Sequence, residues 1–192
     1  GNRLFALTGK VGSPDPQVLI QSNDLGQTWD TLATVSLYWV RQMAKVGNTV
    51  YFLYGSPENN TIQALDLNSG RTLNIDTFTY ISSDFRYVYA MKSMGDKIFL
   101  ATDWGLYRYS DGGNKIEKIY NEKTTMLSVR GDTLISLTQD NFIFSRDEGQ
   151  TWTSIPHNYF FWPTSPKELY FVNGKPWMVA SDDLNGCKEL AI

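Results

Sequence analysis

The residues of this chain whose chemistry suits a ligand site are a few aromatic side chains together with arginines and aspartates. Aromatic rings beside carboxylates and guanidinium groups could bind a sugar or a peptide. Two of the aspartates, Asp84 and Asp103, could also serve a glycoside hydrolase, which needs two carboxyl groups about 5 to 9.5 Å apart. The candidate binding residues are Trp39, Arg41, Tyr80, Asp84, Arg86, Asp103, Trp104 and Trp162.

Composition limits the other classes of function. The 192 residues carry a net charge of -3 and 19% charged residues, so a basic surface for nucleic acid is not expected. No apolar run approaches the length of a membrane span. The single cysteine, Cys187, excludes a disulfide within the chain. A metal site or catalytic triad would depend on the only histidine, His157, which we expect in a solvated loop. No cofactor is expected.

The elements that must position such a site are indicated by a repeated segment. The sequences SNDLGQTW and SRDEGQTW begin 123 residues apart, at Ser22 and Ser145. An Asp carboxylate can accept backbone N–H bonds from the residues that follow it, and Gly supplies the positive φ of a tight turn. The Trp at the end is expected to anchor the next strand in the core. The repeated residues are Ser22, Asp24, Gly26, Thr28 and Trp29, and Ser145, Asp147, Gly149, Thr151 and Trp152.

Both segments resemble Asp-boxes, also called BNR repeats, and match at all five signature positions. The resemblance is to β-propellers of the sialidase-like and Vps10-like superfamily. It implies that each segment is structural and joins the third and fourth strands of a four-stranded blade. It also implies a secreted, periplasmic or cell-surface location.

Two weaker copies of the segment fill the gap between the strong ones. The acid or amide positions of the four copies are separated by 44, 43 and 36 residues, close to the period of a four-stranded propeller unit. Two-residue hairpin signals recur in step at 47–48, 95–96, 131–132 and 173–174. The residues assigned to the weaker copies are Asn68, Gly70, Asp111 and Gly113.

These repeats predict an all-β chain, a β-propeller of four-stranded antiparallel blades. About five blades are expected within a single propeller domain or part of one, at about 1–35, 38–78, 87–120, 124–155 and 167–192. Both end blades are expected to be incomplete, which favours a fragment of a larger propeller. A closed five-bladed ring is the alternative. Open end blades also predict self-association, because unpaired strand edges invite pairing with other chains.

The predicted faces of the blades suggest where a ligand binds. The repeated turns mark one face as structural, and the candidate binding residues lie in loops on the opposite face. We predict a non-catalytic module that binds or scaffolds a protein or carbohydrate ligand there. The alternative is a sialidase-like glycoside hydrolase, in which Arg41 and Arg86 would belong to an arginine cluster. No Tyr–Glu nucleophile pair can be placed in the sequence. Aromatic residues at blade junctions can also simply fill the space between sheets.

Overall fold

The structure is a computed structural model that describes residues 3–9, 16–37, 40–55, 61–75, 87–110, 115–157, 164–182 and 186–191. Every regular element in these ranges is a β-strand, which confirms the prediction of an all-β chain. None of the described residues forms a helix that could span a bilayer. The chain divides into two compact units, residues 1–84 and 85–192.

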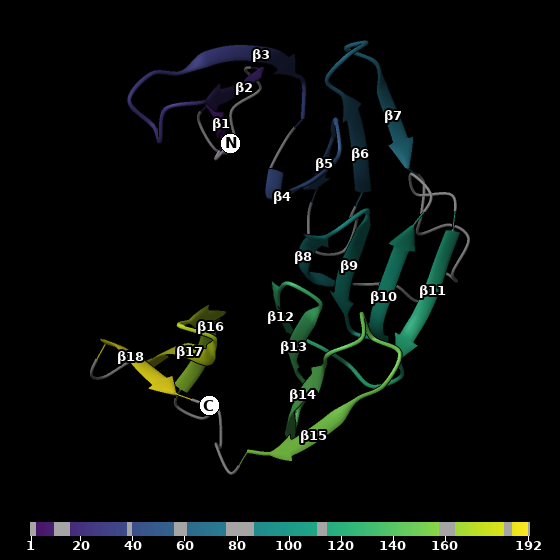
Figure 1. Ribbon diagram of the computed structural model, residues 1–192, viewed down its shortest axis with the longest axis vertical. Coiled ribbons are helices and arrows are strands. Elements are labelled where there is room, and N and C mark those ends of the chain that lie inside the picture. The colour runs from purple at the N-terminus through teal and green to yellow at the C-terminus, as the bar shows by residue number, and fades with distance from the viewer. Residues whose placement is uncertain are drawn as a thin grey trace. The chain divides into compact units, whose positions relative to one another are not determined.

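Unit 1 contains two antiparallel sheets in which each strand pairs with its neighbours in the sequence (Figure 1). Sheet 1 consists of β1 (Leu4–Thr8), β2 (Gln17–Ser22) and β3 (Asp30–Val35). Sheet 2 consists of β4 (Val40–Val46), β5 (Thr49–Tyr54), β6 (Thr61–Asp66) and β7 (Thr72–Ile75).

Unit 2 contains three sheets of the same design. Sheet 3 consists of β8 (Val88–Met94), β9 (Lys97–Thr102), β10 (Gly105–Ser110) and β11 (Lys115–Tyr120). Sheet 4 consists of β12 (Met126–Arg130), β13 (Thr133–Leu137), β14 (Asn141–Ser145) and β15 (Thr153–Pro156). Sheet 5 consists of β16 (Thr164–Val172), β17 (Lys175–Asp182) and β18 (Gly186–Ala191). Strand β12 contacts both β8 and β16, so the first strands of the three sheets are neighbours (Figure 1).

The hairpin signals of the sequence lie where they were predicted. Each joins the first two strands of a sheet through a two-residue turn, as in the pair Arg130–Thr133 around residues 131–132. Gly47, Gly95 and Gly131 all have positive φ, between 54° and 59°, which glycine adopts without steric strain. The five sheets therefore follow the predicted repeats, and sheets 1 and 5 have three strands each in the described residues.

The cores lie between successive sheets of each unit. In unit 1, one hydrophobic cluster joins sheet 1 to sheet 2 and includes Leu19 and Phe52. In unit 2, strand β13 serves two clusters at once. Leu134 belongs to the cluster with sheet 3, and Ile135 belongs to the cluster with sheet 5. Full burial of such a side chain contributes about 2 kcal/mol, so packing between sheets is the main source of stability.

The expectation that His157 is a solvated loop residue is wrong. Its side chain is buried, and its ring meets the ring of Phe142 edge-on with centroids 5.2 Å apart. Its Nε2 atom lies 3.4 Å from the Thr138 carbonyl oxygen, and its backbone N–H donates to the Asp140 carbonyl. His157 therefore closes the end of sheet 4 as a core residue.

Candidate functional site

The first repeated segment forms a compact turn between β2 and β3, here called the first turn (Ser22–Trp29). Asp24 Oδ1 accepts the backbone N–H of Thr28 at 2.9 Å, and Asp24 Oδ2 accepts the Thr28 hydroxyl at 2.5 Å. The Ser22 hydroxyl donates to Asp24 Oδ1 at 2.7 Å and accepts the Gly26 N–H at 2.8 Å. The two side chains therefore satisfy the backbone donors of the turn.

The second repeated segment, the second turn (Ser145–Trp152), joins the third and fourth strands of sheet 4 with the same bonds. Asp147 accepts the Thr151 N–H at 2.9 Å and the Thr151 hydroxyl at 2.6 Å. Ser145 donates to Asp147 at 2.7 Å and accepts the Gly149 N–H at 2.7 Å. The backbones match as well, because Leu25 and Glu148 have φ of 62° and 58° before glycines at 93° and 87°.

These hydrogen bonds lower the pKa of both aspartates from 3.8 to about 2. For Asp24 the largest cause is the hydrogen bond from the Ser22 hydroxyl, followed by the Thr28 hydroxyl and N–H. For Asp147 the largest cause is the Thr151 hydroxyl, followed by the Thr151 N–H and Ser145. A carboxyl group with so low a pKa is a poor general acid at neutral pH. The arrangement thus suits holding a turn and not transferring a proton.

The weaker repeat in sheet 2 closes its turn with a different residue. Asp66 Oδ1 accepts the N–H groups of Asn68 at 2.7 Å and Ser69 at 3.1 Å, and these bonds lower the pKa of Asp66. Asn68, which the sequence aligns with Asp24, instead accepts a hydrogen bond from the side-chain amide of Asn48 at 3.4 Å. The carboxylate has moved two positions toward the N-terminus, onto the position of Ser22. Asp111 and Gly113 of the other weak repeat lie outside the described residues.

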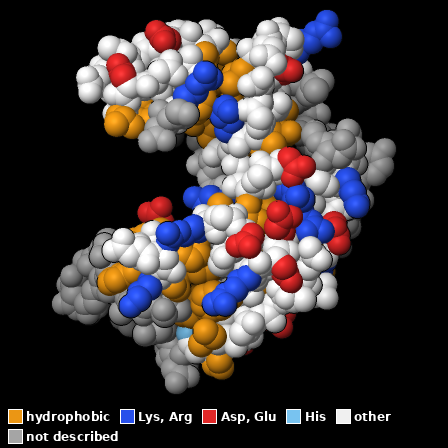
Figure 2. Space-filling view, viewed as in Figure 1, with side chains coloured by type: hydrophobic (Ala, Val, Ile, Leu, Met, Phe, Trp, Pro, Cys, Tyr) orange, Lys and Arg blue, Asp and Glu red, His pale blue; other side chains and the backbone are white. Residues whose placement is uncertain are grey.

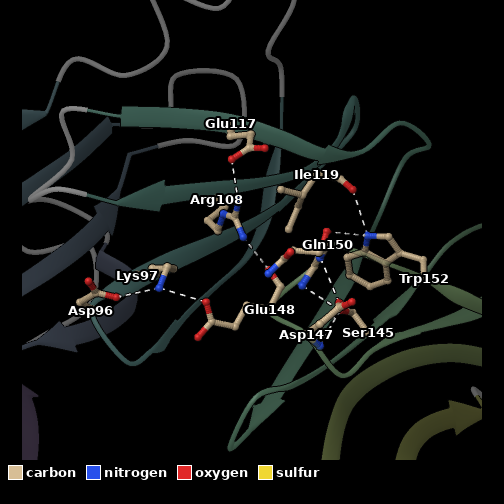
Figure 3. Close-up of polar contacts among 11 residues, drawn as sticks. Asp96, Lys97, Arg108, Glu117, Ile119, Ser145, Asp147, Glu148, Gln150 and Trp152 are labelled. Atoms are coloured by element: carbon tan, nitrogen blue, oxygen red, sulfur yellow. Dashed lines mark hydrogen bonds and ion pairs between the residues drawn. The ribbon is translucent and has the colours of Figure 1, made fainter.

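The second turn is held against sheet 3 by the Trp152 side chain (Figure 3). Trp152 Nε1 donates to the Ile119 carbonyl of β11 at 3.0 Å and to the Gly149 carbonyl at 3.2 Å. The Trp152 ring meets the Tyr120 ring edge-on with centroids 5.3 Å apart. Ile119 also covers Gly149 so closely that a Cβ there would lie 2.5 Å from Ile119 Cδ1. Glycine is favoured here by its φ, and a Cβ would force the end of the Ile119 side chain to shift.

Charged side chains surround the same junction (Figure 3). Arg108 donates to the Glu148 carbonyl at 3.0 Å and pairs with Glu117 at 2.7 Å. Lys97 pairs with Asp96 at 2.9 Å and with Glu148 at 3.0 Å, and hydrogen bonds to these two carboxylates raise the pKa of Lys97. Pairs this accessible to solvent add little to stability. Their main effect is to fix the orientation of the turn on sheet 3.

The first turn has no such cover among the described residues of its unit, and the expectation that Trp29 is buried is wrong. Trp29 is 41% exposed and Leu25 is 68% exposed. Leu4 pairs with Ser22, and Leu134 pairs with the equivalent Ser145. Leu4 is 41% exposed, whereas Leu134 is fully buried. The same local structure therefore presents an apolar surface in sheet 1 and a packed junction in sheet 4.

The predicted binding residues are only partly described. Arg41 lies in unit 1, at a bulge where the pairing of β4 with β5 shifts; the residue is exposed, and partial desolvation of its guanidinium group lowers its pKa. Asp103 and Trp104 lie in unit 2, in the turn between β9 and β10. The remaining predicted residues lie outside the described ranges: Trp39, Tyr80, Asp84, Arg86 and Trp162.

Asp103 and Trp104 belong to a surface that we call the loop surface (Tyr87, Tyr89, Asp103, Trp104 and Lys123). Asp103 Oδ1 accepts the Tyr87 N–H at 3.4 Å, and Trp104 is 46% exposed. The rings of Tyr87 and Tyr89 stack with centroids 6.0 Å apart, and Lys123 Nζ lies 5.2 Å from the Tyr89 centroid. The candidate binding residues predicted from the sequence did not include Tyr87, Tyr89 or Lys123. The spacing of Tyr87 and Tyr89 was the available signal, because residues two apart in a strand share a face.

Comparisons with solved structures identify the fold. The chain resembles the N-terminal domain of Nup159 (TM-score 0.62, 14% identity, 92% of this chain and 49% of that one). It resembles YCF48 bound to D1 peptide (TM-score 0.54, 15% identity, 95% and 65%). It also resembles PorZ, a surface component of the type IX secretion system of Porphyromonas gingivalis (TM-score 0.54, 16% identity, 94% and 27%). No family model matches the chain, and neither does any curated protein.

The chain therefore has a β-propeller-type fold, and the five sheets are its blades. It spans between about a quarter and two thirds of the length of these three structures. At identities of 14 to 16%, the likeness concerns the fold alone.

Proposed function

We propose that this chain is a non-catalytic Asp-box β-propeller module that binds a protein ligand through the loop surface. The observation that carries the proposal is the grouping of three aromatic residues with one cation and one carboxylate on that surface. Trp104 supplies a large exposed apolar area, the Tyr87–Tyr89 pair supplies a rigid platform, and Lys123 adds a positive charge. Aromatic residues of this kind dominate the binding energy of many protein interfaces.

The assignment of the two turns as Asp-boxes is part of the proposal. It is supported by the five matching residues and by the near-identical hydrogen bonds of Asp24 and Asp147. In sheet 4 the turn joins the third and fourth strands, as the resemblance implies. In this assignment the repeated residues stabilise the blades, and ligand binding uses the opposite loops.

A protein ligand is favoured over a carbohydrate by two considerations. One structural neighbour, YCF48, has been solved with a bound peptide. In addition, Asp103 uses one carboxylate oxygen to accept a backbone N–H, so it is partly committed to its own loop. The glycoside hydrolase alternative depends on Asp84 and Arg86, which lie outside the described residues, and no described contact supports it. A secreted or surface location agrees with PorZ being a surface component.

The proposal is tested by selecting a random peptide library against the purified protein and screening a glycan array in parallel. Peptides should be recovered, and the Trp104→Ala and Lys123→Ala variants should bind them at least about tenfold more weakly. Val172→Thr is the matched control, because Val172 is 39% exposed in the same unit and lies outside the loop surface. Recovery of glycans alone, turnover of a chromogenic sialoside, or peptide binding that survives Trp104→Ala would each contradict the proposal.

A further inference from the structure

A groove runs between sheets 4 and 5 on the side of the second turn. It consists of two adjoining cavities of about 540 and 480 Å³ that share Phe144, Arg146 and Pro176. Ile155 lines one cavity, and Arg130 and Phe171 line the other. In Figure 2, hydrophobic side chains run between these two sheets with Lys or Arg side chains on either side. The groove is therefore apolar along its length and basic at its edges.

The charge of the groove is opposite to that of the chain. Among the described residues, two arginines and no acidic residue line the cavities, whereas the chain has a net charge of -3. Arg130 lies over the hairpin turn of sheet 5, with its Nη1 atom 3.0 Å from where a Cβ on Gly174 would be. Neither Arg130 nor Arg146 forms an ion pair with a described residue. An acidic segment would complement both.

The junction of sheets 3 and 4 shows what fits such a groove. There, the last strand of sheet 3 receives the second turn of sheet 4, and Tyr120 contacts Trp152. Ile155 occupies the position in sheet 4 that Tyr120 occupies in sheet 3. Each of them pairs with the second residue of the third strand of its sheet, which is Leu106 for Tyr120 and Phe142 for Ile155. Ile155 is 48% exposed. The groove thus offers to a further turn the kind of contact that sheet 3 offers to the second turn.

The same chain carries a turn with the matching properties. The first turn exposes Leu25 and Trp29, the residues equivalent to Glu148 and Trp152. Residues 22 to 30 contain two acids, Asp24 and Asp30, and no Lys or Arg. The first turn is therefore acidic and apolar at its tip. It has the same conformation as the second turn, which packs against sheet 3.

We propose that the first turn of one copy of this chain docks in the groove of a second copy, with Trp29 against Ile155 and the acidic residues facing Arg130 and Arg146. The contact is heterologous, because the turn of one copy meets the groove of the other. In a dimer, the copy that donates its turn keeps a free groove, and the other copy keeps a free turn. Association therefore continues into open chains unless the geometry closes a ring. A single turn buries little area, so the association is weak and concentration-dependent.

Sedimentation velocity over a range of protein concentrations tests the proposal. The buffer is reducing, because the one cysteine could otherwise cross-link copies. The wild type should form oligomers, and Trp29→Ala and Arg146→Glu should each weaken association by about tenfold or more. An equimolar mixture of the two variants should form a one-to-one dimer, since the first variant keeps an intact groove and the second keeps an intact turn.

Two further variants guard against a folding defect. Leu25→Arg places a positive charge on a 68% exposed side chain and should abolish association without altering the circular dichroism spectrum. Trp104→Ala removes a comparably exposed tryptophan from the loop surface and should leave association unchanged. A wild type that remains monomeric, association that persists in Trp29→Ala, or a mixture that fails to dimerise would overturn the proposal.

Discussion

The first and second turns have the same conformation and the same internal hydrogen bonds, yet one is exposed and the other is packed. In both, a serine and an aspartate satisfy the backbone, and in both the pKa of the aspartate is about 2. Among the described residues of their own units, only the second turn meets a strand of a neighbouring sheet, through Ile119 and Tyr120. A repeated motif can therefore determine the local structure of a turn completely. The stability that the turn contributes depends on whether a neighbouring blade packs against it.

The tryptophans should separate these two contributions most clearly. Trp152→Ala removes a partly buried ring, its edge-on contact with Tyr120 and its bond to Ile119, so we expect a loss of about 3 kcal/mol. Trp29→Ala removes a ring that is 41% exposed, so we expect a loss of about 1 kcal/mol. Urea denaturation of dilute protein measures both. Equal losses would mean that the ring stabilises its own turn and that the neighbouring blade adds nothing.

The glycines provide a second comparison at constant backbone strain. Gly26→Ala and Gly149→Ala both place a Cβ on a residue with φ near 90°, which costs about 1 to 2 kcal/mol in either turn. At Gly149 the new Cβ would also lie 2.5 Å from Ile119 Cδ1, whereas at Gly26 the nearest atoms are 3.7 Å away. We expect the Gly149→Ala variant to lose about 1 kcal/mol more than Gly26→Ala. Thermal melting measures both losses, and equal losses would mean that the Ile119 side chain shifts to make room for the new Cβ.

The acid response should be alike in the two turns, because it depends on their internal bonds. An aspartate with a lowered pKa stabilises the folded state above pH 3.8, and this stability is lost as the pH falls toward about 2. Carboxyl ¹³C titration should place both pKa values well below 3.8. Asp24→Asn and Asp147→Asn should each remove the acid-dependent loss from their own unit. A clearly higher pKa for Asp24 would show that packing against a neighbour supports the hydrogen bonds.

These contrasts explain which features the sequence could predict. The turns and hairpins follow from local chemistry, so Gly131 and Asp147 could be assigned from their neighbours in the chain. Burial depends on another sheet, so nothing in SNDLGQTW distinguishes an exposed Trp29 from the packed Trp152. His157 was misjudged because its burial depends on Phe142 and Thr138, which lie beside it in the same sheet but earlier in the chain. Asp66 was missed because a carboxylate can close the same turn from a shifted position.

The residues that precede the two turn glycines should give the smallest effect. Leu25 and Glu148 both have φ near 60°, a conformation that asparagine tolerates better than either residue. Leu25→Asn removes backbone strain and an exposed apolar side chain, so we expect a gain of about 0.5 kcal/mol. Glu148→Asn relieves the same strain but breaks the ion pair with Lys97, which is worth about 0 to 1 kcal/mol, so its net effect should be near zero. Chemical denaturation at low and high salt separates the two terms, because salt weakens only the ion pair. Equal gains for both variants in low salt would mean that the Lys97–Glu148 pair does not help to hold the second turn on sheet 3.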